Sequence, residues 1–145
     1  MRLYTHPKLR ITVEELNGIN YVKEVWRGVF NTIVFRDLVN NSLTIYEEEL
    51  SKIKTDPNEK FLLFADVREL ELIREEDITW LSEIVNPRYE TLGFTHQAVI
   101  APVTELASEI VDPYNSRIDN QPFVTKVFKN EGDGIKWFIN SLKKE

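Results

Sequence analysis

The sequence predicts an α/β domain in which four helices cover a mixed, mostly parallel sheet of five strands. Two observations predict this class. Residues 9–28 contain two segments of strand character joined by a tight turn, which is the pattern of an N-terminal hairpin. From residue 31 onward, short apolar segments alternate with segments of helical periodicity, as in sheets whose parallel strands are joined by helices. We therefore expect one domain over residues 1–145, in the order β-β-α-β-α-β-α-β-α.

The hairpin is predicted from alternation and from its turn. In residues 9–16, LRITVEEL, the apolar Leu9, Ile11 and Val13 alternate with polar residues, which is typical of a half-buried strand. Asn17-Gly18 readily adopts the positive φ angles of a type I′ turn. The segment INYVKEVWRGVF that follows is rich in β-branched and aromatic residues, and we expect the second strand to end at Gly28.

A change of period predicts the first helix and the strand after it. Asn31 or Thr32 is a suitable N-cap. The apolar residues that follow recur at spacings of three and four: Phe35, Val39, Leu43, Tyr46, Leu50 and Ile53. Asp56-Pro57-Asn58 predicts a closing turn. The apolar run in KFLLFADVREL, residues 60–70, then predicts a short strand that is covered on both faces and ends at Asp66.

The rest of the chain predicts three further helices and two strands. Glu75-Glu76-Asp77 supplies negative charge at a helix N-terminus, Pro87 is expected to interrupt or kink that helix, and Gly93 to end it. The segment HQAVIAPV predicts the fourth strand, and Thr104 after it can cap a third helix. FVTKVF predicts the fifth strand, and Asn130 begins the last helix.

Composition and charge exclude several classes of partner and site. The chain has 24 acidic and 18 basic residues, a formal charge of −6, whereas domains that bind nucleic acid normally present a basic face. The absence of cysteine excludes a disulfide framework, a thiolate zinc site and a cysteine nucleophile. The start of the chain lacks the apolar core of a signal peptide, and the longest apolar stretches are too short to span a bilayer. We expect a soluble cytoplasmic protein with no nucleic-acid partner and no membrane insertion.

Several segments, taken in order, resemble the SpoIIAA-like branch of the STAS fold, the fold of sulphate-transporter and anti-sigma-factor-antagonist domains. They read VWRGVF, LLFADVREL, REEDITWLSEIVNPRYETLGF, QAVIAP and VFKNEGDGIKWFI, and Trp80, Pro87, Gly93, Ala98 and Pro102 are the most specific matches. The resemblance implies a SpoIIAA-like fold. Related domains are used as protein-docking modules, and some bind nucleotides or lipids. The anti-sigma-factor antagonists are switched by phosphorylation of a serine after the central strand, but residues 66–77 here contain no serine or threonine.

The predicted topology also suggests where a ligand or partner would bind. In an open parallel sheet, ligands bind beyond the carboxyl ends of the strands. The polar side chains expected there are Asp66, Arg68, Glu69, Thr104, Lys129 and Asn130. In a functional interpretation they form a polar rim that binds a partner or a small anion. In a structural interpretation Asp66 pairs with Arg68 or caps a turn, because an exposed ion pair is worth about 0–1 kcal/mol and needs no function.

The sequence contains no recognisable catalytic arrangement. His6 and His96 lie far apart with no metal-ligand spacing, and there is no Gly-x-Ser-x-Gly elbow and no glycine-rich phosphate loop. A phospho-acceptor role for Asp66 would need an acidic pair at an earlier strand end to hold magnesium, and neither strand of the hairpin ends in one. We expect no enzymatic activity, no cofactor and no metal.

Two functions follow from these observations. The first is a non-catalytic protein-interaction or regulatory module whose partner is another protein or a second copy in a homodimer. Trp80 and Trp137, which lie beside the apolar stripes of their helices, would supply an exposed apolar patch for such a partner. The alternative is a carrier or sensor of a small apolar or amphipathic ligand, held among the aromatic side chains that face the helices.

Overall fold

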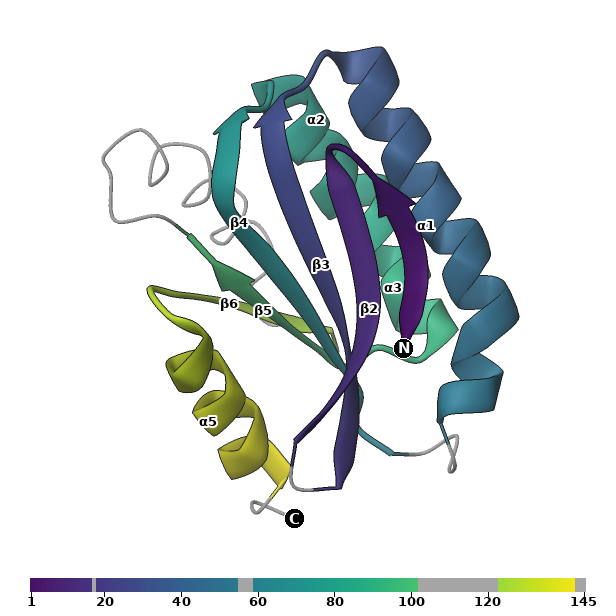
Figure 1. The fold of residues 1–145 in the computed structure, drawn as a ribbon, viewed down its shortest axis with the longest axis vertical. Coiled ribbons are helices and arrows are strands. Elements are labelled where there is room, and N and C mark those ends of the chain that lie inside the picture. The colour runs from purple at the N-terminus through teal and green to yellow at the C-terminus, as the bar shows by residue number, and fades with distance from the viewer. Residues whose placement is uncertain (17, 55–58, 102–122, 143–145) are drawn as a thin grey trace.

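The computed structural model describes residues 1–16, 18–54, 59–101 and 123–142, and their strands form one six-stranded sheet (Figure 1). The strands lie in sequence order: β1 (Arg2–His6), β2 (Leu9–Leu16), β3 (Ile19–Val29), β4 (Leu62–Leu72), β5 (His96–Ile100) and β6 (Val124–Phe128). The pairs β1–β2 and β2–β3 are antiparallel, and the three later pairs are parallel. The predicted mixed, mostly parallel α/β class is confirmed.

The described sheet has six strands where five were predicted, because residues 2–6 form β1 at its edge. The pairing of β1 with β2 is irregular between Arg2 and Tyr4, and the N-terminal ammonium donates to the carbonyl of Val13 at 3.0 Å. Leu3 and Tyr4 are only partly buried. This short segment lacks a clean alternation of apolar and polar residues, so it becomes a strand through its pairing with β2.

The predicted hairpin is present, and its second strand is slightly longer than expected. β2 and β3 pair in one continuous register from Leu9 opposite Trp26 to Leu16 opposite Ile19. Gly18 has a φ of 81°, a left-handed value that glycine adopts without strain. β3 continues to Val29, one residue beyond the predicted end.

The helices cover both faces of the sheet (Figure 1). Against one face pack α1 (Thr32–Ile53), α2 (Glu75–Trp80), the π-helical turn η1 (Leu81–Val85) and α3 (Asn86–Leu92); against the other packs α5 (Glu131–Leu142). Asn31 is the N-cap of α1, where its side chain accepts the N–H of Val34 at 2.8 Å. The predicted apolar stripe of this helix is buried from Phe35 to Leu50.

The helix predicted from residue 75 to Gly93 is divided into α2, η1 and α3. The interruption begins before Pro87: the N–H of Asn86 donates to the carbonyl of Leu81, five residues earlier, which is the π-helical pattern. Pro87 then follows as the second residue of α3. Gly93 ends α3 with a φ of 109°, as predicted.

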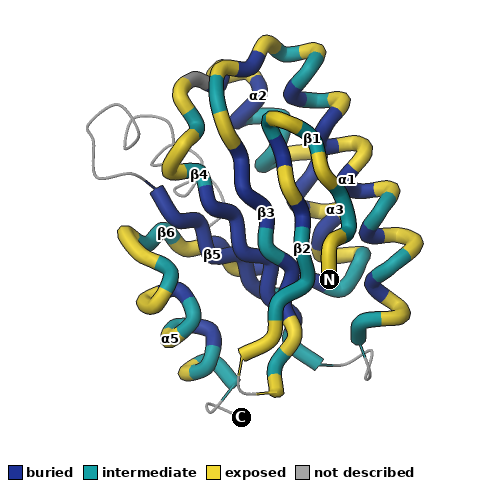
Figure 2. Tube along the Cα trace, in the orientation of Figure 1, coloured by how far each residue is buried: buried dark blue, intermediate teal, exposed yellow. Residues whose placement is uncertain are grey.

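The central strand β4 runs to Leu72 and does not end at Asp66. It follows the long strand β3, with register shifts between Val25 and Arg27 and between Gly28 and Val29. Its first half is buried on both faces, as predicted (Figure 2). Leu63 and Ala65 face α1 to α3, whereas Leu62 and Phe64 face α5.

The fifth predicted strand is β6, and α5 begins directly after Asn130, as predicted. The third predicted helix, from Thr104, lies outside the described residues. Among the helices in the described ranges, none has the length and apolar character needed to cross a membrane.

Candidate functional site

The strand-end residues that the sequence singled out form local structural contacts. Asp66 is buried within β4 and accepts two bonds from the guanidinium of Arg68, from Nε at 2.9 Å and from a terminal nitrogen at 2.7 Å. The backbone N–H of Arg68 adds a third bond at 3.1 Å. Burial disfavours the ionised form of Asp66, but these bonds and the charge of Arg68 outweigh it and lower its pKa. Asp66 thus pairs with Arg68, as the structural interpretation of the sequence expected.

Two of the other predicted rim residues, Glu69 and Asn130, have separate partners. Glu69 forms an exposed ion pair with Arg27 at 2.7 Å. Asn130 accepts the N–H of Asp133 at 2.9 Å in the first turn of α5, and Lys129 before it is exposed. Thr104 lies outside the described residues.

Trp80 and Trp137 are half-buried and lie on opposite faces of the sheet. Trp80 packs edge-on against Phe35 in the cluster beneath α1. Trp137 packs against Phe128 and His96 in the cluster beneath α5. The two side chains therefore do not share one surface.

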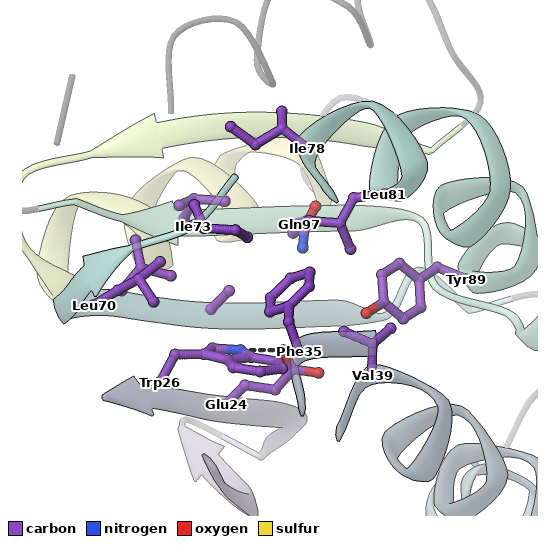
Figure 3. A pocket seen from close by; sticks show the side chains of 13 residues that line it. Glu24, Trp26, Phe35, Val39, Leu70, Ile73, Ile78, Leu81, Tyr89 and Gln97 are labelled. Atoms are coloured by element: carbon purple, nitrogen blue, oxygen red, sulfur yellow. Dashed lines mark hydrogen bonds between the residues drawn. The ribbon is translucent and has the colours of Figure 1, made fainter. Parts of the chain in front are cut away.

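A cavity of about 80 Å³ lies between the sheet and the helices α1 to α3 (Figure 3). The helix-facing residues of β3, β4 and β5 form one wall, and α1, α2, η1 and α3 form the other. Most of the lining is apolar: Trp26, Phe35, Val39, Ala65, Val67, Leu70, Ile73, Ile78, Leu81 and Val99. A single buried water needs roughly 10–15 Å³ on a comparable measure, so the space exceeds that of one water.

Three polar side chains also line the cavity: Glu24, Tyr89 and Gln97. In Figure 3 the hydroxyl of Tyr89 and the amide nitrogen of Gln97 are directed into it. The amide oxygen of Gln97 accepts a bond from the hydroxyl of Thr125 on β6 at 3.0 Å, and this bond orients the amide. A mostly apolar hollow with a few convergent polar groups is the usual form of a small-molecule site.

Glu24 is a buried carboxylate in the wall of this cavity, and it is 2% exposed. Trp26, two residues along the same face of β3, donates its indole N–H to one carboxylate oxygen at 2.9 Å (Figure 3). Tyr46 of α1 donates its hydroxyl to the other oxygen. Burial raises the pKa of Glu24, and the two donors offset only part of this effect. Burial and the nearby charge of Glu24 raise the pKa of Tyr46 well above its ordinary value.

A second buried acid connects α2 to the start of α1. Asp77 of α2 is fully buried and pairs with Nε of Arg36 on α1 at 3.0 Å. The hydroxyl of Thr32 donates to its other oxygen at 3.1 Å. These bonds fix α2 to the start of α1, next to the cavity residues Phe35 and Ile78.

Sequence reasoning did not single out Glu24, although one signal for it exists. In the segment VKEVW, alternation places Glu24 on the same side of the strand as Val22 and Trp26, between two residues of core type. Within the described part of the chain, no group of three or more His, Asp or Glu side chains is arranged to hold a metal ion.

Comparison with known proteins bears on the fold. No family model and no curated protein matches the chain. Among solved structures, the chain is similar to an uncharacterised protein of the DUF3478 family with a SpoIIAA-like fold from Shewanella loihica. The TM-score is 0.58 and the identity 17%, over 90% of this chain and 93% of that one. The chain has a SpoIIAA-like α/β fold, which confirms the expectation from the sequence; at this identity the likeness concerns the fold alone.

Proposed function

We propose that the domain binds a small apolar molecule in the cavity between its sheet and α1 to α3, as a non-catalytic carrier or sensor. The observation that carries this proposal is the cavity itself, with apolar walls and the polar groups of Glu24, Tyr89 and Gln97. The π-helical turn η1 contributes Leu81 to its wall, and such turns occur frequently at functional sites.

The energy of an empty cavity supports a ligand. Protein interiors are close-packed, and vacant volume costs about 24 cal/mol per Å³ in a core. Because the pocket is partly open, about 2 kcal/mol is the upper limit of what an apolar ligand would recover by filling its 80 Å³. This is a large fraction of the 5–15 kcal/mol by which domains are typically stable. A bound apolar molecule would recover the missing contacts.

Filling the cavity with a side chain will abolish ligand binding. Val99 lines the cavity, whereas Val127, its register partner on β6, does not. We expect freshly purified wild-type protein to carry a small molecule in native mass spectrometry, and the Val99→Phe variant to have lost it. The Val127→Phe variant adds the same side chain next to the cavity and should retain the ligand.

Two controls make this result decisive. Unfolding curves will establish that both phenylalanine variants are folded at the temperature of the measurement. The proposal is wrong if the wild type carries no small molecule and also fails to bind xenon, an apolar atom that enters dry protein cavities.

Protein docking is a second candidate function, and two exposed side chains favour it. Val29 at the end of β3 is 49% exposed, and Ile33 at the start of α1 is 74% exposed. Both residues lie at the connection between β3 and α1, and an exposed apolar surface there would suit a protein interface. Both candidate functions suit a cytoplasmic domain, because a chain without cysteine fits a reducing compartment.

If the exposed residues Val29 and Ile33 form a dimer interface, a charged side chain at Ile33 will dissociate the dimer. We expect sedimentation velocity to detect a dimer of the wild type and a monomer of Ile33→Asp, because a buried unpaired charge is costly at an interface. Ile84→Asp, at an exposed position on η1, serves as the matched control and should remain dimeric. A wild type that stays monomeric at high concentration would exclude self-association and leave another protein as the partner.

A further inference from the structure

The charge of the cavity restricts which apolar molecule it accepts. Glu24 is the only ionisable acid or base among the described side chains that line it, apart from the phenol of Tyr89; no lysine, arginine or histidine is present there. An anion inside the cavity would lie near the carboxylate of Glu24 without a compensating positive charge. Burying such an anion is very unfavourable.

The hydrogen bonds of Glu24 leave room for one more donor. A carboxylate can accept about four hydrogen bonds, two on each oxygen. The described contacts supply two, from Trp26 on one oxygen and from Tyr46 on the other. A ligand group that donates a hydrogen bond could therefore bind to Glu24 without displacing either partner.

We propose that the cavity selects an uncharged apolar molecule that bears one hydrogen-bond donor, such as an alcohol, and that Glu24 is the residue that accepts this bond. The inference rests on the proposed function, because it needs a ligand in the cavity. It excludes carboxylate-bearing molecules such as fatty acids.

Three small probes test this selection. n-Butanol and methyl propyl ether are isomers that differ in whether they can donate a hydrogen bond, and butyrate has a similar chain with a negative charge at neutral pH. The experiment titrates each probe into the wild type and follows the methyl resonances of Val99 and Leu81, which line the cavity. We expect n-butanol to bind at least about ten-fold more tightly than either other probe, because a hydrogen bond to a buried carboxylate is among the stronger kinds.

The Glu24→Gln variant tests the residue assigned to this selection. A neutral amide of the same shape can donate to butyrate, so the ratio of butanol to butyrate affinity should fall about ten-fold or more. Glu15→Gln removes the same charge from an exposed position on β2 and should leave the ratio unchanged. The wild-type probe series decides the question by itself if Glu24→Gln does not fold.

The possible results separate this inference from the proposed function. Equal binding of the three probes, or tightest binding of butyrate, would overturn the selection by Glu24 while the ligand cavity stands. The same conclusion would follow if xenon binds and n-butanol does not. If neither xenon nor any probe perturbs the cavity resonances, both proposals are wrong.

Discussion

Replacing Tyr46 with phenylalanine will lower the free energy of unfolding by about 2 kcal/mol, although the change removes a single oxygen atom. Tyr46 is fully buried, and its hydroxyl donates to the carboxylate of Glu24. Without this donor, Glu24, which is 2% exposed, would keep only the described bond from Trp26. Leaving a buried charged group short of a donor costs more than an ordinary hydrogen bond contributes. Urea unfolding of the two proteins measures the difference.

Two comparisons distinguish this effect from a general loss of packing. Tyr4→Phe makes the same change on the partly buried strand β1 and should cost less than about 0.5 kcal/mol. The loss in Tyr46→Phe should also shrink as the pH falls through the raised pKa of Glu24, because a protonated carboxyl needs the donor less. A loss that is equal at neutral and acidic pH would contradict the role given to Glu24.

Acidification from pH 7 to pH 4 will remove up to about 3 kcal/mol of stability through His96. Burial, with a smaller effect from the charge of Lys60, lowers the pKa of His96 from 6.5 to about 4. The ring packs against Trp137 and Phe138, with its Nδ1 2.7 Å from the hydroxyl of Thr95. The folded state therefore binds the proton at a lower pH than the unfolded state does. Stability is complete above pH 6.5 and declines as the pH falls toward 4.

The effect of His96 must be measured as a difference, because Glu24 acts in the opposite direction. The raised pKa of Glu24 makes its contribution more favourable as the pH falls toward 4.5. The lowered pKa of Asp66 costs stability mainly below its ordinary value of 3.8. Urea unfolding of the wild type and of His96→Gln across pH 7 to pH 4 isolates the histidine: the variant should lose less stability on acidification. Parallel curves for the wild type and His96→Gln would refute the prediction.

Local patterns predicted the elements whose cause is local. The alternation of LRITVEEL and the Asn-Gly pair after it predicted the hairpin, and the spacing from Phe35 to Leu50 predicted α1. Two features depend on distant residues and were missed. β1 exists because β2 offers it a partner, and β4 extends past Asp66 because β3 beside it is long. The short stretch of sequence that forms each strand shows neither the pairing of β1 with β2 nor the length of β3 beside β4.

The candidate site was less predictable than the fold. Because ligands of open parallel sheets bind beyond the carboxyl ends of the strands, the site was predicted there. Asp66 and Asn130 instead form local contacts. The cavity lies between layers, and its walls come from seven elements spread over residues 19–100. Lys23 and Glu24 are adjacent charged residues in β3, and alternation assigns Glu24 to the face of Val22 and Trp26, but the sequence does not show that helices cover this face. Lys23 instead pairs with Glu131 of α5 on the opposite face.

The bidentate pair of Asp66 and Arg68 has a consequence for how the central strand aligns. From Leu62 to Ala65 every side chain of β4 is apolar, so these residues fit either face of the sheet equally well. A slip of one residue would exchange the two faces and drive Asp66 into the apolar layer under α1, away from Lys23. The charged pair thus penalises a misaligned strand that the hydrophobic residues alone would tolerate.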